Sequence, residues 1–194
     1  MPEPAGPADP VPPGPAFSSA TDRAANVFGA LALVVTDQAT DAIAAAAGRS
    51  ESAAAALSAL LHFLDRPSVD RLRQVLGLTS SGTVRLIDRL AESGYVRREP
   101  GPDGRSAAIV LTGAGRVAAA RVTQARAEVL GGALGVLSDA ERAAFEELAG
   151  KVIVGMMRGP GATRWICRLC DTGTCRGTPG GCPVGNAAIR RYAP

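Results

Sequence analysis

Residues 68–112 read SVDRLRQVLGLTSSGTVRLIDRLAESGYVRREPGPDGRSAAIVLT, and this stretch decides the fold that we expect. Its first half predicts two short helices joined by a tight turn. Ser68 and Thr79 can each cap free backbone N–H groups at the start of a helix. Gly77 and Gly94 suit the left-handed position that ends one. Apolar residues at helical spacings give the two helices an expected inward face of Leu72, Val75, Leu76, Leu78, Val84, Ile87 and Leu90.

The second half of the stretch predicts a β-hairpin. YVRRE at 95–99 and AIVLT at 108–112 are β-prone runs, and PGPDGRSA at 100–107 is rich in turn-forming residues. Two helices followed by a basic hairpin make a winged helix-turn-helix, whose second helix is shaped to enter a DNA major groove. The predicted fold class is therefore mainly α, with the strands of the wing making it an α+β winged helix.

Long apolar helices are predicted on both sides of this unit. Their apolar stripes need a partner, and a second copy of the chain is the simplest one, so a homodimer is expected. The two DNA-binding units of such a dimer would also match the two half-sites of a pseudo-palindromic operator in double-stranded DNA. The chain is expected to divide into a disordered Pro-rich arm at 1–18, a main domain at 19–158 and a four-cysteine segment at 159–194. Within the main domain, the dimerisation helices are expected at about 21–48, 113–131 and 138–158, and the winged helix-turn-helix at about 50–112.

The composition argues against several other classes of protein. The net charge of +3 permits nucleic-acid binding without requiring it. The best apolar run, VFGALALVV at 27–35, is cut short by Thr36, Asp37 and Gln38, so no membrane-spanning helix is expected. The N-terminus lacks the features of a secretory signal, which leads us to expect a cytoplasmic protein. His62 is the only histidine, and we expect it to be a half-buried helix residue; without it no Ser-His-Asp or Cys-His set forms, so an enzyme is not expected.

The run from Leu78 to Arg116 resembles the MarR (multiple antibiotic resistance regulator) family. The matching features are the second helix, DRL followed by glycine, a hydrophobic residue and V-x-R, a wing with D-x-R, and a strand that ends in L-T-x-x-G. By order of elements the similarity extends over about Thr21 to Met157. The resemblance implies a dimeric transcriptional regulator, usually a repressor, whose dimer helices relay a small-molecule or other effector signal to the DNA-reading lobes.

The second helix supplies most of the predicted DNA contacts. Ser80, Ser81 and Thr83 are short hydrogen-bonding residues at the helix start, where the backbone also favours phosphate. Arg85 lies one turn into the helix, where a guanidinium can bond guanine through two hydrogen bonds. Arg89 lies one turn further and is expected to contact a base or a phosphate.

The wing supplies the remaining predicted contacts. Arg97 and Arg98 alternate along a strand, so only one of them is expected to face DNA, and we assign Arg98 to that role. Arg105 suits a narrow minor groove, where its positive charge is attracted. The family resemblance implies that Asp103 orients Arg105 through a charge-assisted hydrogen bond.

All the cysteines of the chain lie close together, at Cys167, Cys170, Cys175 and Cys182. In a reducing compartment such a cluster indicates metal binding more than disulfides. Four thiolates suit zinc, which we favour because the C-x2-C-x4-C-x6-C spacing resembles a zinc knuckle. An iron–sulfur cluster is the alternative, because Cys182 is followed by proline as in ferredoxin-type motifs.

The metal decides between several functions. Zinc would make the segment a structural clip or a zinc sensor, and Arg164, Arg168 and Arg176 would offset the charge of the thiolates. An iron–sulfur cluster would make the protein a redox or nitric-oxide sensing regulator. A third alternative is an interaction module, in which the cysteine knuckle docks onto another protein while the DNA-binding scaffold carries it.

Overall fold

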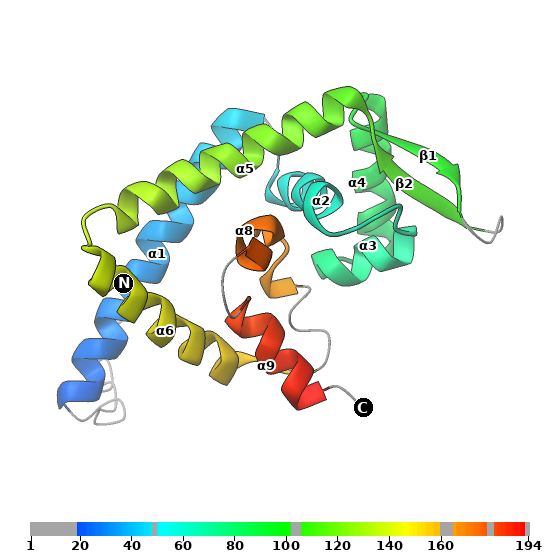
Figure 1. Ribbon diagram of the computed structural model, residues 1–194. Coiled ribbons are helices and arrows are strands. Elements are labelled where there is room, and N and C mark those ends of the chain that lie inside the picture. Colours follow the sequence, from blue (N-terminus) through cyan, green and yellow to red (C-terminus); the bar gives the residue numbers. More distant parts are fainter. Residues whose placement is uncertain (1–18, 48–49, 102–105, 160–164, 178–180, 193–194) are drawn as a thin grey trace, which may run out of the picture.

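Helices dominate the computed structural model of the chain, which describes residues 19–47, 50–101, 106–159, 165–177 and 181–192 (Figure 1). The described elements are α1 (Ser19–Ala47), α2 (Glu51–His62), α3 (Val69–Leu76), α4 (Ser80–Glu92), β1 (Val96–Pro100), β2 (Ala107–Leu111), α5 (Gly113–Leu134), α6 (Asp139–Met156), α8 (Thr172–Gly177) and α9 (Pro183–Tyr192). The two strands pair antiparallel, with Val96 opposite Leu111. The expected fold class, mainly helical with the small sheet of a winged helix, is confirmed. The arm at 1–18 lies outside the described residues.

The main hydrophobic core lies in what we call the winged-helix lobe, made of α2, α3, α4, both strands and the first turns of α5. Helix α2 is central, and its residues from Ala53 to Leu60 are all buried. Alanine makes up most of this run, and its small side chain lets the neighbouring elements approach the helix closely. The largest fully buried apolar side chains of the lobe are Leu57, Leu72, Leu86, Ile87, Leu90, Ile109 and Val75.

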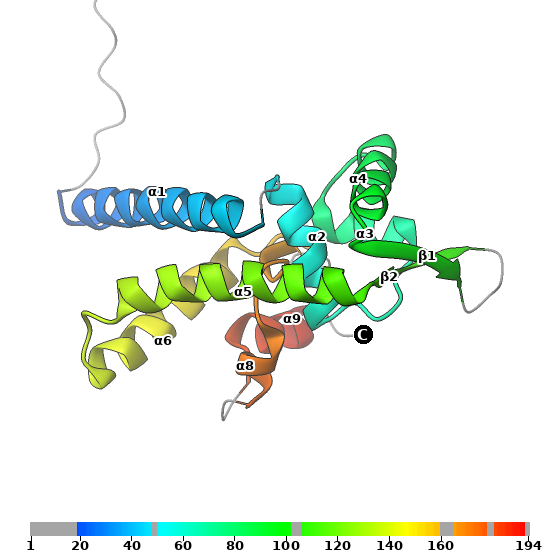
Figure 2. The same ribbon diagram turned by 90° about the horizontal axis from the view of Figure 1, so that it is seen from above.

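The long helices extend away from this lobe. Helix α5 leaves the wing and runs alongside α1, as both views show (Figures 1 and 2). Helix α6 follows α5 in the chain, and α9 packs against α6. The C-terminal elements α8 and α9 therefore lie between α6 and the winged-helix lobe (Figure 1).

The predicted helix starts are confirmed by their cap hydrogen bonds. Ser68, Thr79 and Thr112 each accept a hydrogen bond from the backbone N–H three residues further on, at 3.0–3.2 Å. Ser138 and Glu141 form a reciprocal capping box at the start of α6. The backbone and hydroxyl hydrogen bonds from Ser138 hold the pKa of Glu141 below its usual value.

Two details of the helices differ from the sequence predictions. Val84 was expected to face inward, but it is 42% exposed, because the buried stripe of α4 runs through Thr83, Leu86, Ile87 and Leu90. The helix expected over about 113–131 continues to Leu134, through Gly131 and Gly132. Each glycine costs a helix only about 1 kcal/mol relative to alanine, and propagation of an existing helix tolerates that cost.

Helix α1 is more apolar overall than its best short run suggested. Its span Arg23–Ala46 is long and apolar enough, by length and composition, to cross a membrane, with a mean hydropathy of 1.3 and only 6% of the window buried. The apolar stretch is therefore longer than the run at 27–35 indicated, which corrects the expected length of that stretch. The alanine-rich turns beyond Thr36 keep the mean hydropathy of α1 high across Asp37 and Asp41.

Ser58 gives a first testable prediction. Its side chain is 1% exposed in α2, and its hydroxyl has no hydrogen-bond partner among the described residues. A buried polar group without a partner destabilises the folded state, and alanine also favours a helix. We expect Ser58→Ala to raise the free energy of unfolding by about 1 kcal/mol in urea titrations. Ser52→Ala, on the less buried start of α2, is the control and should change it by less than about 0.5 kcal/mol; a loss of stability in Ser58→Ala would contradict this account.

Candidate nucleic-acid interface and cysteine cluster

Helix α4 presents one polar face outside the lobe. Its buried stripe holds the helix against α2 and α3, which leaves Ser80, Ser81, Arg85 and Arg89 exposed. The two arginines lie one turn apart and line an open groove together with Ser50 and the start of α2. The described part of the chain shows no ion-pair partner for either arginine. Their guanidinium groups are thus available to an anionic ligand.

Thr83 does not belong to this exposed face, and its predicted role is corrected. The side chain is fully buried, and its hydroxyl donates a hydrogen bond to the Thr79 carbonyl at 2.9 Å. A threonine can bond the carbonyl four residues earlier in this way, which satisfies the hydroxyl inside the lobe. Thr83 therefore anchors α4 instead of contacting DNA.

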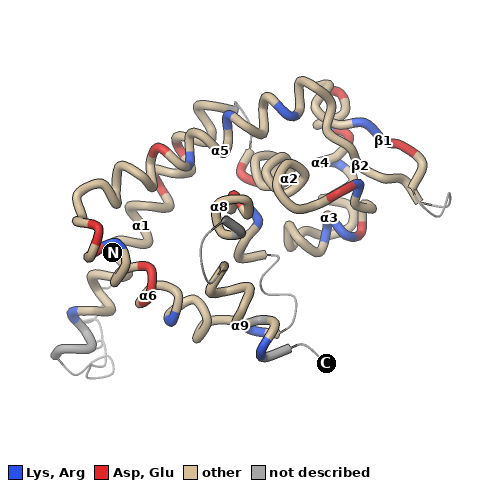
Figure 3. The backbone as a smooth tube through the Cα atoms, in the orientation of Figure 1, with Lys and Arg blue, Asp and Glu red and all other residues tan. Residues whose placement is uncertain are grey.

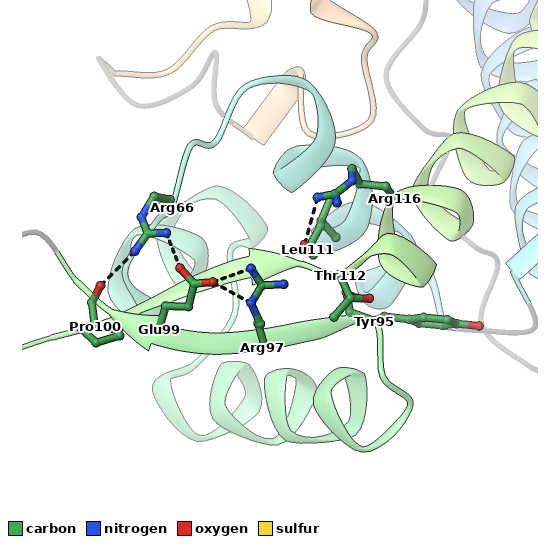
Figure 4. A network of polar contacts seen from close by, with 8 residues as sticks. All are labelled: Arg66, Tyr95, Arg97, Glu99, Pro100, Leu111, Thr112 and Arg116. Atoms are coloured by element: carbon green, nitrogen blue, oxygen red, sulfur yellow. Dashed lines mark hydrogen bonds and ion pairs between the residues drawn. The ribbon is translucent and has the colours of Figure 1, made fainter.

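The loop end of strand β1 is fixed by a network of charges that the sequence reasoning missed (Figure 4). Glu99 of β1 accepts hydrogen bonds from Arg66 and from Arg97, the latter at 2.6 Å, and Arg66 also donates to the Pro100 carbonyl at 3.0 Å. The hydrogen bonds from Arg66 and Arg97 hold the pKa of Glu99 below its usual value. Arg66 has a positive φ of 44°, which is uncommon for a residue other than glycine. In the sequence, the proline of Asp65-Arg66-Pro67 indicates the end of a helix, but it does not indicate that Arg66 contacts Glu99.

The remaining predicted wing residues have different outcomes. Arg98 pairs with Asp88 of α4 at 2.6 Å, so it joins β1 to the second helix of the motif at the same exposed face. Asp103 and Arg105 lie outside the described residues. Acidic and basic residues alternate along α3, α4 and β1 (Figure 3), so the charges of this face are placed individually and do not form one uniform basic patch.

The four cysteines form two hydrogen-bonded pairs, and none of them is in a disulfide. The Cys167 thiol bonds the Cys170 sulfur, which lowers the pKa of Cys170 to about 6 and raises that of Cys167. The positive charges of Arg126 and Arg168 also favour the Cys170 thiolate. Cys175 pairs with Cys182, and the pKa of Cys175 is raised by burial and then by the charge of its partner.

The two pairs lie close enough for their charges to act on each other. In the described residues, however, no group of three or more His, Cys, Asp and Glu side chains is arranged to hold a metal ion. Of the arginines expected to offset thiolate charge, Arg168 lies beside Cys170. Arg164 and the side chain of Arg176 lie outside the described residues. Metal binding by these cysteines therefore stays a prediction.

His62 lies at the end of α2 and is half-buried, as predicted. Its Nε2 lies 2.8 Å from Thr123 Oγ1 of α5, and its Nδ1 lies 3.4 Å from an Asp171 carboxylate oxygen. The histidine therefore connects α2, α5 and the cysteine segment. The sequence indicated the burial but not these partners, because they lie 61 and 109 positions away along the chain.

A cavity of about 250 Å³ lies between α1, α5 and the cysteine segment. Its walls are mostly apolar, and Arg126 and Arg168 supply its positive charge. Its apolar lining includes Ile43, Ala54, Leu130, Ile166 and Leu169.

A helix-turn-helix with an exposed polar second helix and an adjoining antiparallel wing defines the class of winged-helix domains that bind DNA. Residues 47–106 match the sequence model of the MarR family. This match supports the resemblance carried by residues 78–116. No curated protein sequence matches the chain.

Solved structures of MarR proteins share the fold. A MarR family protein from Bacillus stearothermophilus is 24% identical, with a TM-score of 0.63 over 74% of this chain and all of that one. MepR of Staphylococcus aureus, a transcription regulator of the multidrug efflux pump MepA, is 16% identical, with a TM-score of 0.60 over 73% of this chain and all of that one. Sco3205 of Streptomyces coelicolor, solved in complex with DNA, is 19% identical, with a TM-score of 0.59 over 74% of this chain and 95% of that one. The chain therefore has the MarR winged-helix fold.

Proposed function

We propose that the protein is a dimeric transcriptional regulator that binds a pseudo-palindromic operator in double-stranded DNA through α4 and the wing. The observation that carries this proposal is the exposed face of α4, on which Ser80, Ser81, Arg85 and Arg89 lie together without ion-pair partners among the described residues. Hydroxyl groups at a helix start suit phosphates, and arginines one turn apart suit base edges in a major groove. The match to the MarR family supports the same function, and the family resemblance implies repression as its usual direction.

Selection from a library of random DNA duplexes tests this function, because the protein itself then picks out its operator. The full-length protein should enrich one sequence with two inverted half-sites, spaced by about one helical turn between their centres. A single-stranded library of the same length is the control and should show no comparable enrichment. Failure to enrich any duplex above the starting library would refute sequence-specific binding.

The dimer is proposed from apolar surface that the single chain leaves uncovered. Helix α6 exposes a stripe at helical spacing, of Phe145, Leu148, Val152 and Met156, and α1 exposes Val27, Phe28, Leu31, Leu33 and Val34. A second copy would cover both stripes by one two-fold interface. A membrane is a poorer partner for α1, because Asp37 lies near the middle of the apolar span and an aspartate there costs about 3 kcal/mol.

A charged residue substituted into this apolar surface should make the proposed dimer dissociate. We expect the unaltered protein to sediment at twice its chain mass of 19.7 kDa. Leu148→Glu should weaken the dimer at least about 100-fold, because each copy would bury an unpaired charge in the interface. Val117→Glu makes the same chemical change at an exposed residue of α5 that lies outside both stripes, and it should remain dimeric. A monomeric unaltered protein, or a Leu148→Glu dimer of undiminished affinity, would show that α6 is not the interface.

The cavity between α1, α5 and the cysteine segment is the place that we propose for a small-molecule effector. It touches α1 and α5 as well as the start of α2 through Glu51 and Ala54. A ligand there would contact α1, which carries one of the two proposed dimer stripes, and the winged-helix lobe together. Its chemistry would be apolar with an acidic group, because Arg126 and Arg168 are the charged residues that face it along with Glu51.

A further inference from the structure

Residues 165–172 form a strip that docks on the winged-helix lobe, and we call it the docking strip. At one end Trp165 packs over the turn between α3 and α4, where a β-carbon built on Gly77 would lie 3.5 Å from the indole ring. Leu169 packs against the core of the lobe and against a second cluster in which Ile43 of α1 meets α2 and α5. At the other end the Thr172 hydroxyl donates a hydrogen bond to the His62 carbonyl at 2.9 Å.

Two charged residues of the docking strip reinforce these contacts. The guanidinium of Arg168 lies 4.6 Å from the centre of the Trp165 ring, a cation–π distance, and 3.4 Å from the carboxylate of Glu51 in α2. Asp171 lies beside His62. The docking strip therefore contacts the start and the end of α2 as well as the helix-turn-helix itself.

The other end of the cysteine segment packs on a different part of the molecule. Cys182 lies against a small buried cluster in which Met157, at the end of α6, meets Val184 and Ala187 of α9. The next residue, Pro183, sits so close to Gly150 of α6 that a β-carbon there would lie 3.3 Å away. We call α6 and α9 together the α6–α9 unit.

The cysteines thus alternate with the residues that make these contacts. Cys167 and Cys170 lie inside the docking strip, Cys175 follows it in α8, and Cys182 starts the α6–α9 contact. One thiol pair therefore belongs to the winged-helix lobe, and the other reaches the α6–α9 unit through Cys182. A ligand that binds both pairs would join the two parts of the molecule.

We propose that Cys167, Cys170, Cys175 and Cys182 bind one zinc ion as a tetrathiolate site, and that this ion clasps the α6–α9 unit to the winged-helix lobe. Binding draws the two thiol pairs onto a common tetrahedral centre, and each cysteine that still carries a thiol proton releases it to solvent as its zinc–sulfur bond forms. Arg126 of α5 and Arg168 of the docking strip, which both act on Cys170, offset the resulting negative charge. The short segment has little apolar core of its own, so the metal supplies order that its side chains do not.

Metal analysis of the full-length protein, purified without chelator under reducing conditions, tests the site itself. One zinc per chain is expected, and cobalt loaded in its place should give the visible absorption of a tetrahedral thiolate site. Cys170→Ser and Cys182→Ser, one from each pair, should each lose most of this zinc. Stoichiometric iron with the visible absorption of an iron–sulfur cluster would overturn the zinc assignment, and a protein without stoichiometric metal would overturn the site itself.

Hydrogen exchange tests the clasp independently of DNA binding. Chelation of zinc from the unaltered protein should speed amide exchange at least about tenfold in α9 and in the docking strip, while the core of α4 stays protected. Thr172→Val keeps all four cysteines but removes the hydrogen bond to His62, so it should retain one zinc per chain while exchange rises at the end of α2. Equal amide exchange rates in α9 and the docking strip, with and without zinc, would show that a bound metal does not hold the α6–α9 unit to the winged-helix lobe. Failure of this test would leave the proposed DNA binding untouched, because no DNA is present in it.

Discussion

Gly115→Ala is expected to destabilise the protein by about 3 kcal/mol, because the added carbon has no space. A β-carbon at Gly115 would lie 1.9 Å from the Tyr95 carbonyl oxygen and 3.1 Å from the Leu111 side chain. The Tyr95 carbonyl is itself fixed, since it accepts the Thr112 N–H at 3.0 Å where the wing returns to α5 (Figure 4). The glycine of the L-T-x-x-G sequence is thus required by the close approach of α5 to the wing. Urea unfolding followed by circular dichroism measures the change.

Gly113→Ala provides a matched control two residues earlier in the same helical turn. Nothing lies within 4 Å of a β-carbon at Gly113. Alanine also has the higher helix propensity, so this variant should be neutral or more stable by up to about 1 kcal/mol. Equal stabilities of the two variants would contradict the packing of α5 against Tyr95.

Arg85→Ala is expected to weaken binding to the selected operator by about 10- to 100-fold, which corresponds to about 1–3 kcal/mol. Arg85 is exposed one turn into α4, where its guanidinium can bond a guanine through two hydrogen bonds. Its loss should also relax the base preference at one position of each half-site, because the contact reads a base edge. Titrations of labelled duplexes at one fixed salt concentration measure both effects.

Two further variants distinguish a base-specific contact of Arg85 from a general effect of positive charge on DNA affinity. Arg190→Ala removes the same charge from the exposed surface of α9, which lies apart from α4 (Figures 1 and 2), and should leave operator affinity nearly unchanged. Thr83→Val should also retain base preference, because Thr83 is buried and anchors α4 instead of contacting DNA. An Arg85→Ala protein with unchanged affinity and preference would remove α4 from the proposed interface.

The winged-helix lobe could be predicted from the sequence because local rules define it. Ser68 and Thr79 cap the helices that they were predicted to start, and Gly77 takes the expected left-handed conformation with a φ of 65°. The hairpin strands pair where alternating β-prone residues meet turn residues. These signals lie within a few residues of the structures that they specify.

Contacts between distant residues could not be predicted in the same way. At the start of α4 the buried position is Thr83 and not Val84 as expected, and only packing against α2 and α3 decides between them. Arg66 reaches Glu99 across 33 positions, and Thr172 reaches His62 across 110. The cysteine spacing indicated a ligand cluster, but nothing in it showed that one pair would lie on the lobe and the other beside α6.

The central proposal, sequence-specific DNA binding by α4 and the wing, is tested most directly by one pair of affinities. The full-length protein is titrated, at physiological salt, against the selected duplex and against a duplex of the same composition with both half-sites scrambled. The account predicts binding to the selected duplex at least about 1,000-fold tighter than to the scrambled one. Equal affinities for the two duplexes would contradict it.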